Sequence, residues 1–243
     1  GERDGPVLSV RDVSISFGGI HALDKVSFDV QRGTVFGLIG PNGAGKTTLV
    51  NIITGALRPD AGVVTFGGGE VTGLRPHARA RMGLSRTFQA PRLLPSLSLE
   101  RNASIGQWYA RSTTGRRPIK PALLLEMMGL SDLTGRKVSS LNLAEQRRVE
   151  IARALATNPE LVLLDEPTAG MNHVEAFELI KLVVSACKRW GITVLLIEHN
   201  MNIVMGFSDE ITVVSFGKQI AAGTPDQIKT DQTVIDAYLG SHA

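Results

Sequence analysis

The loop of residues 40–47 reads Gly-Pro-Asn-Gly-Ala-Gly-Lys-Thr and fits the pattern Gly-x-x-x-x-Gly-Lys-Ser/Thr. It follows a short apolar run, Thr34–Ile39, with the length of a buried parallel strand, and it leads into a predicted helix from Lys46 to about Leu57. Glycines in such a loop let backbone N–H groups turn toward phosphate oxygens, and the helix N-terminus adds positive potential. The loop therefore predicts an α/β core that binds the phosphates of a nucleotide.

Side chains of this loop have expected roles of their own. Lys46 is expected to reach the β- and γ-phosphates, Thr47 to offer its hydroxyl to Mg²⁺, and Thr48 to make a further phosphate contact. The alternative is a glycine-rich turn with an exposed lysine. The residues predicted to bind nucleotide here are Gly40, Asn42, Gly43, Ala44, Gly45, Lys46, Thr47 and Thr48.

Two adjacent carboxylates follow a second apolar run. Asp165 and Glu166 come directly after Leu161–Leu164, at the strand end where open α/β sheets bind ligands. Asp165 is suited to hold Mg²⁺, directly or through water. Glu166 is suited to polarise an attacking water as general base. The alternative is that both carboxylates only solvate a strand end.

The remaining chain alternates between strand-like and helix-like patterns, which predicts a mostly parallel sheet with helices on its faces. Strands are expected at Val7–Phe17 and Val26–Val30, and the tail is expected to form a hairpin over Ile211–Gly223 and short helices ending near Leu239. Residues 90–140 differ, because they are rich in proline and hold two predicted helices, which indicates an inserted helical subdomain. Further segments predicted as helix or strand are Leu97–Ala110, Pro121–Met128, Ala144–Thr157, Val174–Trp190 and Ile192–Ile197.

Composition narrows the class of protein. Apolar residues make up 43% of the chain, which is enough for a sizeable core, and the net charge of +3 does not demand nucleic acid. The one cysteine, Cys187, stands in an apolar helical pattern, so a disulfide framework is excluded and we expect a core residue in a reducing cytoplasm. No apolar run approaches the length of a membrane helix, and no secretory signal is visible.

Several motifs in one order resemble the ATPases of ABC transporters. After the phosphate loop come Gln89 in Arg-Thr-Phe-Gln, the segment Leu141–Leu155, the Asp165-Glu166 pair and then Glu198-His199. The resemblance implies a single ABC ATPase domain over residues 1–243: a core with a β subdomain (about 7–89 and 145–243) and a helical subdomain (about 90–144). It implies an antiparallel β subdomain beside a phosphate-loop core, with ATP and Mg²⁺ as ligands.

The same resemblance assigns roles to further residues. Phe17 looks like the aromatic residue that stacks on adenine, although it could be an ordinary strand core residue. Gln89 looks like the residue that touches the metal and the attacking water, and His199 looks like the histidine that contacts the γ-phosphate. Asn172 stands where the family often has an aspartate. His21, His77 and His173 show no ligand spacing, so we expect no metal beyond nucleotide-bound Mg²⁺.

The signature motif of the family departs from its usual form. Leu-Ser-Gly-Gly-Gln, which acts on ATP held by the opposite subunit, is replaced by residues 141–145, Leu-Asn-Leu-Ala-Glu. Asn142, Ala144 and Glu145 are therefore placed near that ATP, but Ala144 puts a methyl group where glycine allows close approach to phosphate. We expect slow hydrolysis in a homodimer, or a different partner subunit with a more typical signature.

Further segments are similar to the ATPases of branched-chain amino acid importers. They are Ile197–Met201, Val204-Met205, Gly223–Pro225, Val234–Gly240 and Gly83–Gln89. The resemblance implies a second ABC ATPase subunit, in a homo- or heterodimer, together with integral-membrane permeases and an extracytoplasmic solute-binding protein. It also implies a peripheral position on the cytoplasmic face of the inner membrane and no nucleic acid. Residues 90–95 are expected to form part of a permease docking groove.

Other functions remain open at this stage. Lipopolysaccharide-export ATPases and urea-type importers share much of the pattern, and a weakly hydrolysing nucleotide-binding regulator fits the altered signature. An ABC ATPase acting on nucleic acid or ribosomes fits less well, because such proteins usually carry two ATPase halves or a long coiled-coil insert.

Overall fold

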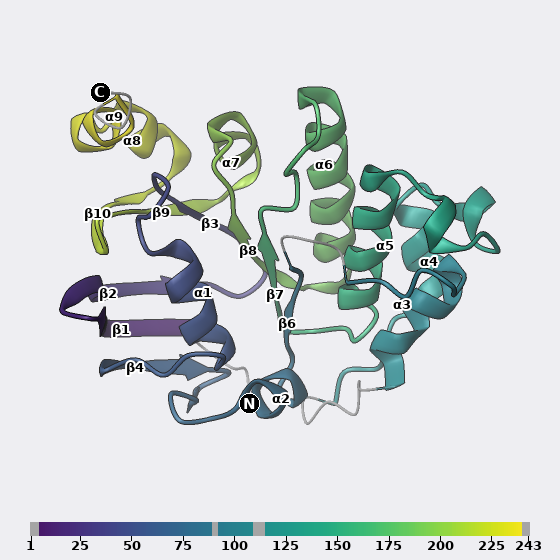
Figure 1. Ribbon diagram of the computed structural model, residues 1–243, viewed down its shortest axis with the longest axis horizontal. Coiled ribbons are helices and arrows are strands. Elements are labelled where there is room, and N and C mark those ends of the chain that lie inside the picture. Colours follow the sequence, from purple (N-terminus) through teal and green to yellow (C-terminus); the bar gives the residue numbers. More distant parts are fainter. Residues whose placement is uncertain (1–4, 89–91, 109–114, 240–243) are drawn as a thin grey trace. The chain divides into compact units, whose positions relative to one another are not determined.

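The computed structural model describes residues 5–88, 92–108 and 115–239 (Figure 1). The chain falls into two units. Unit 1 comprises residues 1–79 and 195–243, and unit 2 comprises residues 80–194. The expected boundaries of a core (7–89 and 145–243) and a helical subdomain (90–144) stay a prediction.

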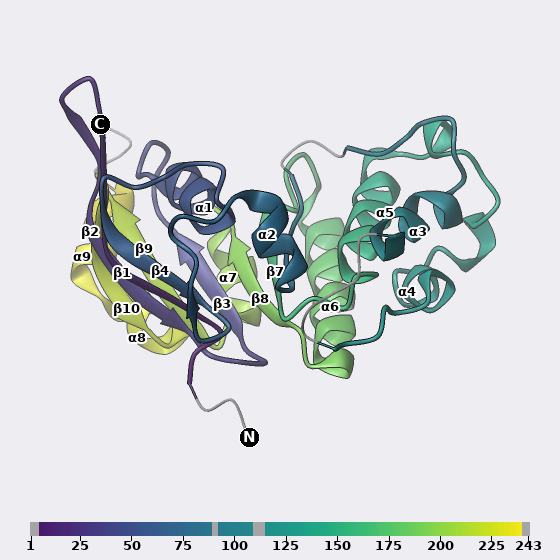
Figure 2. The ribbon, with the colours of Figure 1, turned by 90° about the horizontal axis from the view of Figure 1, so that it is seen from below.

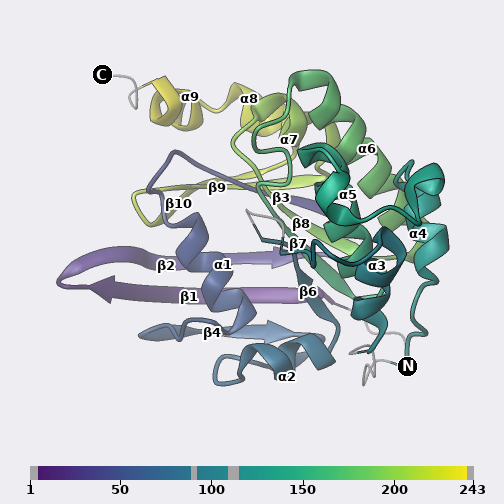
Figure 3. The same ribbon diagram turned by 45° about the vertical axis from the view of Figure 1, so that its right-hand side comes forward.

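The first strands of unit 1 form an antiparallel sheet in the order β2-β1-β4-β5, and Figure 3 shows the three longer strands side by side. Leu8 of β1 pairs with Val30 on one neighbour and with Phe66 on the other. The expected second strand begins earlier than Val26, because Gly18 and Gly19 form the turn that joins it to the first strand. The strands are β1 (Leu8–Phe17), β2 (Ile20–Val30), β4 (Ala61–Phe66) and β5 (Gly69–Glu70).

A second set of strands in unit 1 carries the phosphate loop. β3 (Val35–Ile39) is buried at every residue and pairs in parallel with β9 (Glu210–Ser215), which confirms the buried parallel strand. β9 pairs antiparallel with β10 (Lys218–Gly223), as the predicted hairpin requires. The helix α1 (Lys46–Thr54) follows the loop. Its expected end at Leu57 is wrong, because Gly55 takes a left-handed conformation (φ 79°) that stops the helix.

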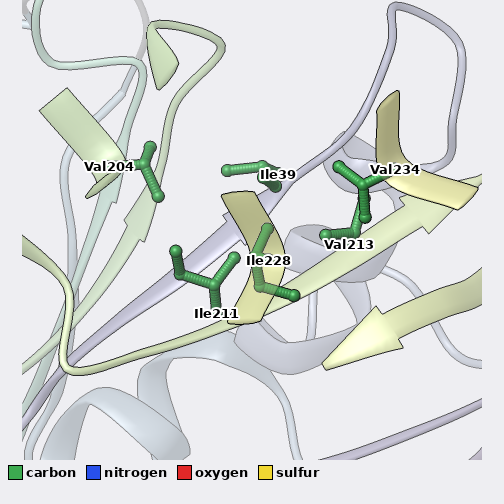
Figure 4. Packing of buried hydrophobic residues seen from close by; sticks show 6 residues of the cluster. All are labelled: Ile39, Val204, Ile211, Val213, Ile228 and Val234. Atoms are coloured by element: carbon green, nitrogen blue, oxygen red, sulfur yellow. The ribbon is translucent and has the colours of Figure 1, made fainter. Parts of the chain in front are cut away.

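The end of the chain covers the strands β9 and β10 with short helices. β8 (Thr193–Ile197), buried throughout, leads the chain from unit 2 back into unit 1, and α7 (Met201–Phe207) follows it. Figure 2 shows α8 (Pro225–Thr230) and α9 (Gln232–Leu239) beside β9 and β10. The buried cluster that joins these elements to the end of β3 consists of Ile39, Val204, Ile211, Val213, Ile228 and Val234 (Figure 4).

Unit 2 combines a pair of parallel strands with a group of helices. β6 (Leu84–Arg86) pairs in parallel with β7 (Leu161–Asp165), and α5 packs against both α3 and α4. The predicted helices are confirmed with small changes at their ends, and α2 (Pro76–Arg81), which was not predicted, lies at the boundary of the units. The helices of unit 2 are α3 (Leu99–Trp108), α4 (Pro121–Met127), α5 (Leu143–Leu155) and α6 (His173–Trp190).

These elements confirm the predicted α/β class, with parallel strand pairs, an antiparallel sheet and a set of helices. Cys187 lies buried on α6, as expected of a core residue, and burial raises the pKa of its thiol to about 12. Among the described ranges, no helix combines the length and the apolar character needed to cross a membrane.

Candidate functional site

The phosphate loop is shaped by glycines that no other residue could replace without strain. A Cβ on Gly40 would lie 2.0 Å from the Val214 carbonyl oxygen, and one on Gly45 would lie 2.7 Å from the Ala22 carbonyl oxygen. Gly43 has open space around it but takes a φ of 77°, which L side chains rarely adopt. The loop is therefore held tightly at both ends, while its exposed tip needs glycine for its backbone conformation.

Lys46 places its ammonium group within this loop. The side chain is buried, and Nζ donates hydrogen bonds to the carbonyl oxygens of Gly40 (2.6 Å) and Pro41 (3.0 Å). The helix α1 begins at the same point, with no side-chain cap at Gly45 and no acidic residue in its first turn. Ammonium group and helix N-terminus therefore place positive potential on one loop, which suits phosphate oxygens.

Other expected ligands of unit 1 have side chains that a nucleotide can reach. Asn42 and Thr47 are exposed and Thr48 is half-buried. Phe17 is 50% exposed where β1 ends, which argues against its being an ordinary core residue. His199 is exposed two residues after the end of the buried strand β8.

Asp165 of unit 2 ends the buried strand β7 and forms an ion pair that was not predicted. Its Oδ2 accepts a hydrogen bond from Arg86 Nη2 at 2.8 Å, and both side chains are mostly buried. Next to this ion pair, the pairing of strand β6 with β7 extends to Thr87, because its backbone N–H donates to the Leu163 carbonyl oxygen at 2.9 Å. A cation bound at Oδ2 would have to share this oxygen with Arg86.

Glu166 follows in an unusual backbone conformation. Its φ is 46°, in the left-handed region that costs a non-glycine residue free energy, and the next residue is Pro167. Residues held in such conformations cluster at functional sites, where the surrounding structure keeps them in place. The strain supports the predicted role of Glu166 and could not be seen in the sequence.

The altered signature residues pair with each other at the start of α5. Asn142 is the N-cap residue: its side-chain oxygen accepts from the Glu145 N–H, and the Glu145 carboxylate accepts from the Asn142 N–H, both at 2.9 Å. This capping box satisfies two backbone donors of the helix start. The same contacts occupy one oxygen of each side chain expected to face nucleotide.

A buried ion pair on α5 holds the chain around residue 88, and sequence reasoning gave it no role. Arg147 and Glu150 lie 2.9 Å apart and are almost fully buried. Arg147 also donates to the Phe88 carbonyl oxygen, and Glu150 accepts from the N–H groups of Phe88 and Arg92. The three-residue spacing of opposite charges on a helix was the only available signal.

The expected site residues are divided between the two units. The phosphate loop, Phe17 and His199 belong to unit 1, whereas Asp165, Glu166 and the signature residues belong to unit 2. Gln89 lies outside the described residues, as do Ala90 and Pro91 of the expected docking groove.

Comparison with known proteins decides the family. The family described as "ABC transporter" matches residues 23–169, which include the phosphate loop, the signature segment and the Asp165-Glu166 pair. The chain belongs to the ATP-binding subunits of ABC transporters. A second family, described as "Branched-chain amino acid ATP-binding cassette transporter", matches residues 218–243 of this ABC ATPase.

Relatives of this ABC ATPase match it along nearly its whole length. The high-affinity branched-chain amino acid transport ATP-binding protein LivG of Escherichia coli is 40% identical and is matched over 97% of this chain and 98% of its own. A crystal structure of an ATP-binding cassette of an ABC transporter in its ADP conformation superposes with a TM-score of 0.86, at 35% identity, covering 96% of this chain and 98% of that one. A dimeric post-hydrolysis structure of another cassette, bound to ADP and phosphate, is 26% identical with a TM-score of 0.76, covering 90% of this chain and 98% of that one. The predicted family and fold are confirmed.

Proposed function

We propose that this ATPase powers the import of branched-chain amino acids through separate permease subunits. The observation that carries the substrate class is the match of residues 218–243 to the branched-chain amino acid family. The name of the E. coli relative, at 40% identity over 97% of this chain, supports the same class. The substrate itself does not pass through an ATP-binding subunit, so the proposal rests on relatives rather than on a substrate pocket.

The nucleotide is proposed to bind with its phosphates on the loop of residues 40–48. Backbone N–H groups from Gly40 to Gly45 and the Lys46 ammonium would hold the phosphate oxygens, and Phe17 would stack on the base. The buried ammonium and the uncapped start of α1 support this role, because both favour a multiply charged anion.

Mg²⁺ is proposed to bind between the nucleotide and three side chains: Thr47, Asp165 and Gln89. Hydroxyl, carboxylate and amide oxygens are ligands that this hard cation prefers. The part of the chain that the structure describes holds no cluster of three histidine, cysteine or acidic side chains that could bind a metal alone. A cation at the proposed site would neutralise developing charge on the phosphates.

The hydrolytic step is proposed to use Glu166 and His199. Glu166 would accept hydrogen bonds from the attacking water and orient it toward the γ-phosphate, with Gln89 contacting the same water. His199 would donate to a γ-phosphate oxygen, where negative charge must be stabilised. The strained conformation of Glu166 and the exposure of His199 after β8 support these roles.

A second ABC ATPase subunit is proposed to complete the site with its own signature residues. In this chain the groups proposed to contact the ATP of the other subunit are those at the start of α5. They are the Asn142–Glu145 capping box, the methyl group of Ala144 and the charge of Glu145. Because a methyl group at Ala144 and a negative charge at Glu145 both oppose the close approach of a phosphate, we propose that a homodimer hydrolyses slowly, or that the partner is a different subunit. The assembly is proposed to lie on the cytoplasmic face of the inner membrane and to receive amino acids from a solute-binding protein.

An uptake assay tests the substrate class. In source cells whose copy of the gene is disrupted, entry of radiolabelled leucine should fall and should return with the wild-type chain. It should not return with Glu166→Gln, which keeps the side chain's shape but not its charge. Unchanged leucine uptake after disruption, with loss of uptake of another solute, would refute the proposed substrate while leaving the ATPase intact.

A further inference from the structure

The helices at the end of unit 1 line an open pocket that the proposed function does not use. Its volume is about 380 Å³, and it lies between α7, α8 and α9. Pockets that bind small molecules in proteins commonly measure about 300–1,000 Å³. The pocket is therefore large enough for a small molecule.

The lining of this pocket favours one kind of ligand. Met201, Met205, Ile228 and Val234 supply apolar surface, and the two methionines can adapt to different shapes. Among the described lining residues, Lys229 is the one charged side chain and none is acidic. Lys229 is exposed whereas Ile228 and Val234 are buried, so the cation lies toward solvent and the apolar wall lies deeper. An apolar body with a single negative charge matches both parts.

The pocket shares its wall with the base of the phosphate loop. Ile228 and Val234 line the pocket and also pack in the buried cluster that contains Ile39, the last residue of β3 (Figure 4). Gly40, the first residue of the loop, follows Ile39 directly. A molecule that packs against Ile228 and Val234 therefore adds contacts to the cluster on which the loop rests.

Tyr238 makes a second connection between the pocket and the loop. Its side chain lines the pocket, packs against the same cluster and interacts through its hydroxyl with the backbone of Gly40. Burial raises the pKa of the Tyr238 hydroxyl to about 12, so the group stays protonated at neutral pH. The pocket thus touches the first glycine of the loop through one side chain.

We propose that this pocket binds a small apolar carboxylate and that the bound carboxylate strengthens nucleotide binding at the phosphate loop. Ordering of the cluster by the first ligand lowers the entropy that the loop loses when it orders around phosphate, which gives positive coupling. The absence of an acidic lining residue disfavours zwitterions, since an ammonium group would find no carboxylate among the described side chains of the pocket. The coupling rests on the proposed nucleotide site, whereas binding to the pocket does not.

Calorimetry on the full chain tests the ligand class. The probe is 4-methylpentanoate, and leucine is its matched partner, because the two differ only by the ammonium group. 4-Methylpentan-1-ol removes the charge at similar size. We expect 4-methylpentanoate to bind about two- to fivefold more tightly than either, the effect of a favourable ion pair with an exposed lysine. Equal binding of the alcohol would overturn the proposal that the pocket prefers a carboxylate. Tighter binding of leucine would overturn the proposal that the pocket disfavours an ammonium group.

Two variants locate the binding, and a longer probe identifies the source of the carboxylate. Lys229→Glu should weaken the binding of 4-methylpentanoate about fivefold, because it replaces an attractive charge by a repulsive one. Ile235→Trp, at an exposed position of the lining, should abolish binding by filling the pocket. Unchanged affinity in both variants would overturn the proposal that 4-methylpentanoate binds in this pocket. Octanoate that binds more tightly than 4-methylpentanoate would indicate a lipid-derived acid, and the reverse order would indicate a branched metabolite.

The affinity for a fluorescent ADP analogue tests the coupling. Saturating 4-methylpentanoate should raise that affinity about fivefold, within the usual range for coupled sites. Tyr238→Phe should bind 4-methylpentanoate within about twofold of the wild type but lose most of the increase, because it keeps the ring and removes the contact with Gly40. Pocket binding without any change in ADP affinity would overturn the coupling. A chain that binds 4-methylpentanoate but no ADP would instead refute the proposed nucleotide site.

Discussion

At the residue scale, Glu166 holds a backbone conformation that costs free energy at a position proposed to be functional. Its φ of 46° is unfavourable for glutamate, and Pro167 restricts it further toward extended conformations. The buried strand β7 before it, with the Ala169 N–H bonded to the Glu166 carbonyl oxygen at 3.2 Å, holds the conformation. A strained residue at the end of a buried strand fits a carboxylate that must point in one direction.

Replacing this carboxylate by an amide gives the first prediction. Glu166→Gln should lower the Mg·ATPase rate about 100-fold or more, since general bases commonly contribute 10²–10⁴. ATP affinity should change little, because the phosphate loop is proposed to supply the binding. The measurement is the rate against protein concentration, with Glu178→Gln, an exposed position on α6, as the control. A rate in Glu166→Gln within threefold of wild type would contradict the role of general base.

The signature residues give a second prediction at this scale. The double variant Asn142→Ser and Ala144→Gly should raise the ATPase rate several-fold, because it restores a small residue and a hydroxyl at the surface proposed to face the partner's ATP. It should also lower the free energy of unfolding by about 1 kcal/mol, since glycine replaces alanine in the first turn of α5. Glu178→Gln, at an exposed position on α6, is the control. An unchanged rate in the double variant would mean that the altered signature does not limit hydrolysis.

At the scale of elements, helix α5 ties the signature to the segment before residue 89. Glu150 accepts from Phe88 and Arg92, Arg147 donates to Phe88, and Arg153 Nη1 donates to the Arg92 carbonyl oxygen at 2.6 Å. Arg92 also stacks over the Phe88 ring, with its guanidinium carbon 4.1 Å from the ring centroid. Both ends of the short stretch that contains Gln89 are therefore anchored to the helix that begins with the signature.

Breaking this anchor gives the third prediction. Glu150→Gln should destabilise unit 2 by about 3 kcal/mol, because it leaves the Arg147 charge buried without its carboxylate. The matched control is Glu178→Gln, which breaks an ion pair of the same three-residue spacing on an exposed helix face and should cost about 0.5 kcal/mol or less. The measurement is the urea midpoint and slope of both variants. Equal destabilisation would show that burial of the Arg147–Glu150 pair carries no special cost.

At this scale, the sequence predicted the features that depend on neighbouring residues and missed the contacts between residues far apart in the chain. The phosphate loop, β3 and the capped helices depend on neighbouring residues, so their sequence patterns predicted them. For the helix α1, only the predicted end was wrong, because the helix stops at Gly55. The Arg147–Glu150 anchor joins positions 58 and 62 residues apart, and the Arg86–Asp165 pair joins positions 79 apart. Such partners depend on the tertiary fold, and a single sequence does not specify them.

At the scale of the whole molecule, the proposed ligands of Mg·nucleotide are widely spaced in the sequence: Lys46 and Thr47 begin α1, and Asp165 ends β7. We expect nucleotide to stabilise the elements around Asp165 as well as the phosphate loop, and more strongly when Mg²⁺ is present. Cys187 reports on unit 2 because it is the one cysteine of the sequence and is 1% exposed. Burial raises the pKa of its thiol to about 12, so a thiol reagent reacts with it only when the unit opens.

The rate of Cys187 labelling in mild denaturant gives the last prediction. Mg·ADP at about one hundred times its dissociation constant should slow labelling about 100-fold, as expected for a ligand that binds only the folded state. ADP with EDTA should slow it much less, because without the cation nothing links Asp165 to the phosphates. Lys46→Ala is the control and should show no nucleotide effect in either condition. Equal slowing with and without Mg²⁺ would mean that Asp165 takes no part in binding the cation, and that nucleotide stabilises unit 2 by another route.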